Sequence, residues 1–275
     1  GGNERLDGGA VSMQAIEAGI RWETRDRILL LTIDRPHCRN ALDPAAHHQL
    51  AHLIDDFHSN NALLVAIITG TGDKAFCAGS DLANADSLDR RNLPPSGFGG
   101  LAERFDLEKP VIAAVNGDAV GGGLELVLAC DLCIAVPAAR FALPEPRVGQ
   151  AASGGLHRLA RHMPRKWMME LVLTGAMFNA EQAAHMGIVN HIAAPGPNGP
   201  DAVAEALQMA QLICSNAPLS VRASKQMIDQ GLAAPDLETA FAGHYPAYEM
   251  MLASDDAAEG RKAFLEKRAP HWQGK

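Results

Sequence analysis

The sequence predicts an α/β protein, because short, densely apolar runs alternate with segments of helical periodicity. Residues 28–33, 63–69, 111–115 and 132–136 are rich in aliphatic residues and carry no charge, which is typical of buried strands. Residues 44–58 place their apolar side chains three and four positions apart, as in a helix with one buried face. Strands followed by a helix, repeated along the chain, favour a sheet covered by helices.

The first elements in chain order are a hairpin and a helix. Residues 21–25 and 28–33 predict two strands around a tight turn. Asp43 is expected to cap the next helix, with Pro44 in its first turn. Residues 84–105 contain Pro-Pro and Gly-Gly pairs and predict an irregular segment, of the kind that forms a lid or pocket wall.

The second half of the chain is mainly helical. Residues 194–200 hold three prolines and two glycines, which predicts a linker and a domain boundary. We therefore expect an N-terminal extension at residues 1–19, an α/β core at 20–193 and a helical region at 194–275. The helices expected in that last region are 201–215, 219–231, 237–252 and 256–266.

Composition excludes several kinds of partner. Twenty-four Lys and Arg residues against 32 Asp and Glu give a net charge of −8, so no basic surface for nucleic acid or anionic membranes is expected. No run of about 20 uninterrupted apolar residues predicts a membrane span. The five scattered cysteines and the absence of a start resembling a signal peptide predict a reducing, cytoplasmic setting.

The most informative motif is a run of three glycines before an apolar helix. Gly121, Gly122 and Gly123 allow the backbone to approach a ligand closely, and the helix that follows presents unpaired N–H groups. Glu125 falls in the first turn of that helix, close to the same place. The alternative is that Glu125 only caps the helix start.

Two further segments could complete a site. Glu145 stands between two prolines, which fix its backbone, and two carboxylates facing one pocket split into one base and one acid. The alternative is a solvated glutamate in a turn. The small residues Ala78 and Gly79 lead to Ser80, whose N–H could join that of Gly122 in a two-donor oxyanion hole.

Other candidate sites are weaker. Cys130 and Cys133 form a CxxC pair, but no second pair accompanies them and the neighbours are apolar, which favours inert core thiols. His47, His48 and His52 include a pair spaced i, i+4, but no third ligand or Glu accompanies that pair, so an exposed helix face is expected. Ser153 is not in a GxSxG elbow, so a serine hydrolase is not favoured.

Five motifs occur in a fixed order along the chain. They are 78–82 (AGSDL), 109–117 (KPVIAAVNG), 121–126 (GGGLEL), 129–131 (ACD) and 141–145 (FALPE). Together they resemble the crotonase, or enoyl-CoA hydratase/isomerase, superfamily. Within it the chain is similar to the carnitinyl-CoA dehydratase (crotonobetainyl-CoA hydratase) branch and related enoyl-CoA hydratases. That likeness rests on 97–101 (GFGGL), 244–246 (HYP) and 259–268 (EGRKAFLEKR).

The resemblance implies a spiral of ββα units, a C-terminal helical trimerisation region and a homotrimer or a dimer of trimers. It implies an acyl-CoA substrate and no metal or redox cofactor. The N–H groups of Ser80 and Gly122 would hold the thioester oxygen, Glu125 would activate water, and Glu145 would exchange the α-proton. The further residues expected at the substrate are Ala78, Asp81, Leu82, Gly121, Gly154 and Lys267, the last from the same or a neighbouring subunit.

Two glutamates favour reversible hydration of a 2-enoyl-CoA over isomerisation, for which one acid suffices. Residues 149–155 are one residue shorter than the family pattern and lack its proline, so an isomerase remains the alternative. Where the carnitinyl enzyme typically has tryptophan and aspartate, Ser80 and Ala152 offer no cage for a trimethylammonium group. A non-catalytic scaffold or an RNA-binding protein is disfavoured by the net charge of −8.

Overall fold

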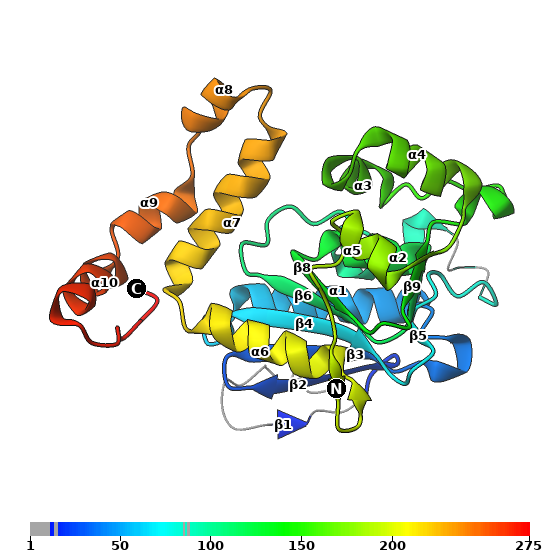
Figure 1. The fold of residues 1–275 in the computed structure, drawn as a ribbon, viewed down its shortest axis with the longest axis horizontal. Helices are drawn as coiled ribbons and strands as arrows, with labels where there is room; N and C mark the ends of the chain where they lie inside the picture. Colours follow the sequence, from blue (N-terminus) through cyan, green and yellow to red (C-terminus); the bar gives the residue numbers. More distant parts are fainter. Residues whose placement is uncertain (1–11, 14–15, 85, 87–88) are drawn as a thin grey trace.

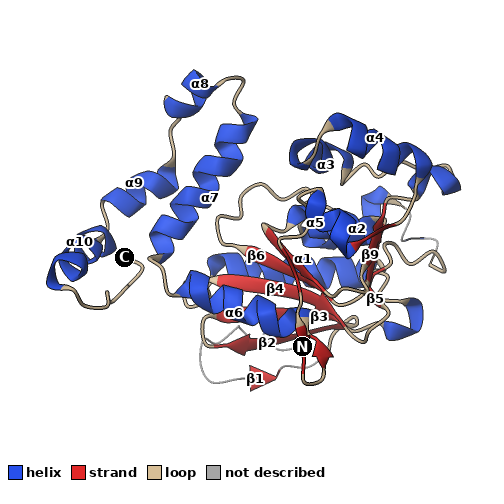
Figure 2. Ribbon diagram, viewed as in Figure 1, coloured by secondary structure: helices blue, strands red, loops and turns tan. Residues whose placement is uncertain are grey.

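The computed structural model describes residues 12–13, 16–84, 86 and 89–275, and it confirms the α/β class (Figures 1 and 2). Its large sheet contains, in spatial order, β1 (Ser12–Met13), β2 (Ile20–Arg25), β3 (Ile28–Ile33), β4 (Val65–Gly70), β6 (Val111–Val115), β8 (Leu132–Ala135) and β11 (His191–Ile192). Its small sheet contains β10 (Phe178–Asn179), β9 (Arg140–Ala142), β7 (Asp118–Val120) and β5 (Ala75–Cys77).

Ten α-helices are found within the described residues. They are α1 (Pro44–Ser59), α2 (Gly122–Ala129), α3 (Leu156–His162), α4 (Arg165–Thr174), α5 (Ala180–His185), α6 (Ala202–Cys214), α7 (Pro218–Ala233), α8 (Leu237–Phe241), α9 (Pro246–Leu252) and α10 (Asp255–Glu266). In the part of the chain described here, none of these is both long and apolar enough to cross a lipid bilayer.

The chain alternates between the two sheets. β4, β6 and β8 run parallel in the large sheet, and the strand that follows each of them, β5, β7 and β9, runs parallel in the small one. α2 follows the pair β6–β7. This arrangement confirms the ββα spiral, and it brings the ends of β5, β7 and β9 to one edge of the small sheet.

The central strands β3, β4 and β6 of the large sheet are buried on both faces, which explains their uninterrupted apolar sequences. Along β3, Leu29 and Leu31 face the core that includes α1 and α2, whereas Ile28 and Leu30 face a second core. The second core is closed by three alanines of α6, spaced four residues apart: Ala202, Ala206 and Ala210. α6 therefore packs on the sheet, although it follows the predicted boundary at residue 194, and the division at that residue stays a prediction.

Three local predictions need correction or completion. Residues 237–252 form two helices and not one, because Pro246 lacks an N–H and disfavours helix in the residue before it. The segment 194–200 is not wholly irregular, since β12 (Pro195–Gly196) pairs with β13 (Gly199–Pro200). Of the predicted extension at 1–19, residues 1–11 and 14–15 lie outside the described residues, and β1 pairs with β2.

Helices α7 to α10 extend away from the sheets in Figures 1 and 2. α7 is held to the core by charged side chains. Arg222 donates to Glu108 at 2.8 Å, and Lys225 donates to Asp131 at 2.8 Å. Gln226 donates to Glu108 at 2.7 Å and accepts from an N–H of α9 at 2.9 Å, so one side chain joins the core, α7 and α9.

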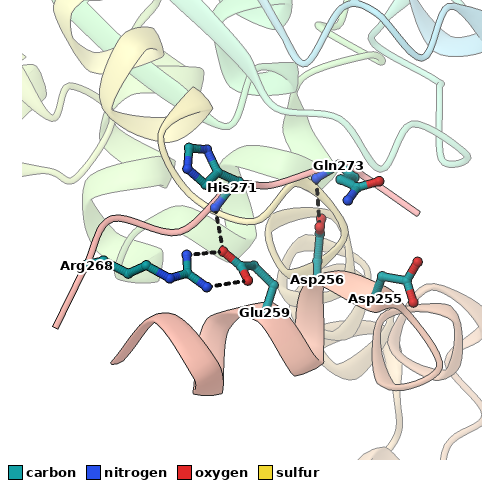
Figure 3. A pocket seen from close by; sticks show the side chains of 6 residues that line it. All are labelled: Asp255, Asp256, Glu259, Arg268, His271 and Gln273. Atoms are coloured by element: carbon teal, nitrogen blue, oxygen red, sulfur yellow. Dashed lines mark hydrogen bonds and ion pairs between the residues drawn. The ribbon is translucent and has the colours of Figure 1, made fainter. Parts of the chain in front are cut away.

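The C-terminal tail folds back on α10, as Figure 3 shows. Buried Asp256 accepts the N–H groups of Gln273 at 2.7 Å and Gly274 at 2.8 Å. Glu259 accepts two hydrogen bonds from Arg268 and a third from the N–H of His271. These side chains line the pocket drawn in Figure 3, and their hydrogen bonds hold the tail against α10.

A buried lysine terminates α1. Lys109 is 2% exposed, and its Nζ donates to the carbonyls of Phe57 and Asn60 at 2.7 Å each. Burial lowers the pKa of Lys109 to about 8. We expect Lys109→Met to lower the free energy of unfolding by about 1–3 kcal/mol, because both hydrogen bonds to carbonyls at the end of α1 are lost. Urea unfolding beside exposed Lys74→Met tests this, and equal stabilities would contradict it.

Candidate active site

Three motifs far apart in the sequence meet where the small sheet's parallel strands end. β5 pairs with β7, and β7 pairs with β9. Residues 78–80 follow β5, Gly121 follows β7, and Glu145 follows β9 after two further residues. Because parallel strands share one carboxyl edge, the topology brings these segments together, and such edges commonly carry binding sites.

Glycines allow backbone contact at this edge. Gly121 has φ +58° and Gly79 has φ +93°, backbone conformations that residues other than glycine rarely adopt. A Cβ on Gly79 would stand 3.2 Å from the nitrogen of Gly122, and one on Gly123 would stand 1.9 Å from the carbonyl oxygen of Cys77. The start of α2 therefore lies directly against the turn that follows β5.

Two backbone N–H groups are available there. Leu42 donates to the carbonyl of Gly79 and accepts from the N–H of Asp81, both at 2.9 Å, so the N–H of Ser80 points to the opposite side of the chain. Gly122 begins α2, where N–H groups have no acceptor within the helix. Neither N–H donates a hydrogen bond to another residue that the structure describes.

Glu125 lies in the first turn of α2 and is 7% exposed. Its Oε1 accepts the N–H of Gly154 at 3.0 Å. Burial, followed by the charge of Glu145, raises the pKa of Glu125 to about 7, although hydrogen bonds from Gly154 and Gly155 oppose the shift. The carboxyl group of Glu125 therefore holds its proton to a higher pH than a solvent-exposed glutamate does.

Glu145 approaches the same place from the other side. Its Oε1 would be 3.1 Å from a Cβ on Gly121, and its buried Oε2 has no hydrogen-bond partner among the described residues. Burial raises the pKa of Glu145 as well. The two glutamates predicted from the sequence thus come together, and the pKa of each is raised, which favours its protonated form.

The loop at residues 149–155 joins the two acids despite its short length. The N–H of Gln150 donates to the carbonyl of Glu145 at 2.9 Å, and the N–H of Gly154 donates to the Glu125 carboxylate. A Cβ on Gly154 would stand 2.7 Å from Oε2 of Glu125. The loop therefore packs directly on the Glu125 carboxyl group.

Of the other predicted substrate-binding residues, some lie near the glutamates and one does not. The N–H of Ala78 donates to the carbonyl of Arg39, and the carboxylate of Asp81 pairs with Arg35 at 3.1 Å. Leu82 follows the segment 78–80 and is 68% exposed. Lys267 ends α10, which Figure 1 places at the opposite end of the molecule from α2 and β9. One chain therefore does not bring Lys267 to the glutamates.

Sequence reasoning missed two residues that pack against the site. Phe98 was part of a motif to which we assigned no role, yet a Cβ on Gly122 would stand 2.3 Å from its ring. His47 was expected on an exposed helix face, and this was wrong, because His47 is 0% exposed. Its apolar neighbours Ala46 and Leu50, at spacings of one and three, are the signal that could have revealed its burial.

Metal ligands do not gather anywhere in the described residues: no group of three or more His, Cys, Asp or Glu side chains could hold an ion. Cys130 and Cys133 are buried, and burial raises the pKa of both thiols. They are core residues, as the sequence indicated.

The chain matches known proteins over nearly its whole length. A profile of the enoyl-CoA hydratase/isomerase family matches residues 23–275. The chain is 39% identical to the carnitinyl-CoA dehydratase of Proteus mirabilis over 260 residues, 92% of this chain and 97% of that protein. It is 41% identical to the carnitinyl-CoA dehydratase of Salmonella typhi over 258 residues, 90% and 95% of the two chains.

Solved structures agree. An enoyl-CoA hydratase from Mycobacterium tuberculosis superposes with a TM-score of 0.85 at 39% identity, covering 94% of this chain and 100% of that one. One from Mycobacterium marinum gives 0.86 at 40% identity with the same coverage. The motifs, the two-sheet spiral and these likenesses together establish that the chain belongs to the enoyl-CoA hydratase/isomerase family.

Proposed function

We propose that the protein catalyses the reversible hydration of a 2-enoyl-CoA thioester to the 3-hydroxyacyl-CoA. The observation that carries this proposal is the pair of buried Glu125 and half-buried Glu145, with raised pKa values beside two unpaired N–H groups. The likeness to carnitinyl-CoA dehydratases and enoyl-CoA hydratases supports the same reaction class.

The proposed reaction adds water across the double bond. The N–H groups of Ser80 and Gly122 donate to the thioester oxygen. Glu125 takes a proton from water as its oxygen attacks C3, and the electron pair of the double bond moves to form an enolate, which the two N–H groups stabilise. Glu145 then delivers a proton to C2, and proton exchange with solvent resets both carboxyl groups.

The surroundings of the two acids disfavour ionising both at once. Burial disfavours both carboxylates, and ionising Glu145 makes ionisation of Glu125 harder still. One ionised and one protonated carboxyl is the combination that the addition needs, with one base for water and one acid for carbon. No separate cofactor is required in this scheme, because coenzyme A arrives as part of the substrate.

Ala78, Asp81, Leu82, Gly121 and Gly154 remain proposed contacts to the substrate. For Asp81 we propose a contact through the backbone, since its carboxylate already pairs with Arg35. Lys267 would have to reach the coenzyme A portion from a neighbouring copy of the chain. The names of the relatives make carnitinyl-CoA dehydration the second candidate, and its product crotonobetainyl-CoA belongs in the same assay.

The first test is the loss of the conjugated enoyl-thioester absorbance with crotonyl-CoA and, separately, with crotonobetainyl-CoA. We expect Glu125→Gln and Glu145→Gln each to lower kcat by about 100-fold or more, because each removes one proton-transfer group. Glu181→Gln, at an exposed position of α5, is the matched control and should leave kcat unchanged. Full activity in either active-site variant would rule out the two-acid mechanism.

The raised pKa of Glu125 predicts how stability depends on pH. The folded state prefers the protonated form, so the native state loses stability as pH rises from about 4.5 through 7. Glu125→Gln keeps the acceptor for Gly154 and carries no charge. We expect it to raise the free energy of unfolding at pH 8 by up to about 3 kcal/mol relative to its effect at pH 4.5. Urea unfolding at both pH values would contradict this if the gain were equal or larger at pH 4.5.

We further propose that the chain assembles as a homotrimer or a dimer of trimers through its C-terminal helices. Large apolar side chains stand exposed on these helices, an arrangement typical of association surfaces. They are Ile228, Leu232, Leu237, Phe241, Met250, Leu252, Phe264 and Leu265. Such an assembly would also supply Lys267 from a second copy.

Light scattering after size-exclusion chromatography tests the assembly. We expect a mass of three or six times 29.2 kDa for the wild type. Leu237→Asp with Phe241→Asp should shift it towards smaller species, because charge is placed in the proposed interface. Leu173→Asp, at a 66% exposed position of α4, serves as the control. A wild-type monomer would refute the proposal.

A further inference from the structure

A short glycine-rich turn is wedged between α1 and α2 beside the site. This 3-10 turn, Phe98–Gly100, makes backbone-close contacts on both sides. A Cβ on Gly100 would stand 2.6 Å from the Cα of Ala51 in α1, and one on Gly99 would stand 2.8 Å from a methyl carbon of Leu126 in α2. The turn therefore packs against α1 on one side and against α2 on the other.

One polar side chain holds this turn from α1. His47 is 0% exposed, and its Nδ1 accepts the N–H of Gly99 at 3.0 Å. Its ring meets that of Phe98 edge-on, with centroids 4.5 Å apart and an interplanar angle of 74°. Burial lowers the pKa of His47 to about 4, so the ring is neutral at pH 7 and carries its proton on Nε2.

Phe98 in turn packs on the backbone of Gly122. The ring is 5% exposed, and three of its carbons lie within 2.7 Å of the position that a Cβ on Gly122 would take. Gly122 supplies one of the two N–H groups proposed for the oxyanion hole. A shift of the ring would therefore move a donor whose direction matters for catalysis.

A histidine at position 47 buries a ring nitrogen without a hydrogen-bond partner in the part of the chain that the structure describes, which indicates that its other nitrogen has a role there. Nε2 of His47 is buried and has no hydrogen-bond partner among the described residues. The neighbouring core positions Ala46 and Leu50 are apolar, and a leucine at position 47 would bury no unsatisfied nitrogen. What leucine lacks is an acceptor for the N–H of Gly99.

We propose that His47 is a positioning residue for the oxyanion hole: its Nδ1 fixes the N–H of Gly99 and so holds the Phe98 ring against Gly122. The inference rests on the proposed hydratase function, because it assigns His47 to the same site. The contacts that the structure describes for His47 are with Gly99 and Phe98, so its effect on the N–H of Gly122 passes through the turn Phe98–Gly100.

Steady-state kinetics of the whole chain described here, with crotonyl-CoA as substrate, test this role. We expect His47→Leu to lower kcat by about 10- to 100-fold with little change in KM, because the donor is misplaced while the binding surface persists. His47→Asn places an amide oxygen near the position of Nδ1 and should restore most of kcat, although it fills the space less well. His52→Leu, on the exposed face of the same helix, is the matched control.

A double variant separates positioning from general loss of packing. We expect His47→Leu combined with Phe98→Leu to lower kcat no further than the worse single variant, since both changes remove the same packing of the Phe98 ring on Gly122. Unchanged kcat in His47→Leu would overturn the proposal. Equal losses of kcat in the Asn and Leu variants, in step with their unfolding temperatures, would also overturn it. Absence of hydration by the wild type would instead refute the proposed function itself.

Discussion

The parallel pairing of β5, β7 and β9 is the constraint on which the site depends. Each strand is only three residues long, so the pairing is stable only because the large sheet and α2 bury it in a common core. The glycines after β5 and β7 then let two backbone segments touch. That contact leaves the N–H groups of Ser80 and Gly122 beside the two glutamates, and no single side chain could create it.

The second constraint is electrostatic. Burying Glu125 next to Glu145 costs stability above neutral pH, and backbone N–H groups of Gly154 and Gly155 offset part of this cost. Such an electrostatic cost is common at functional sites, where a group must change its protonation state near neutral pH. His47 belongs to the same pattern, since this core position holds a polar ring whose Nε2 has no partner among the described residues.

Much of this could be predicted from the sequence, for physical reasons that also explain the failures. The strand at residues 111–115 and the cap of α1 by Asp43 were predicted because periodicity and capping act locally. β7 was missed because three residues carry no readable period. The burial of His47 and the distance of Lys267 from the glutamates depend on how α1, Phe98–Gly100 and α10 pack, which local patterns do not encode. Pro246 is a local signal for the break between α8 and α9, since a proline is favoured in the first turn of a helix and disfavoured inside one.

The central claim is that the paired glutamates and the two N–H groups add water across an enoyl thioester. Incubating 2-hexenoyl-CoA with the protein in water enriched in oxygen-18 and deuterium, followed by mass spectrometry, tests it most directly. We predict a 3-hydroxyacyl-CoA that carries one labelled oxygen on C3 and one deuterium on C2. A product of unchanged composition with a shifted double bond, or deuterium uptake without oxygen, would contradict hydration and favour an isomerase.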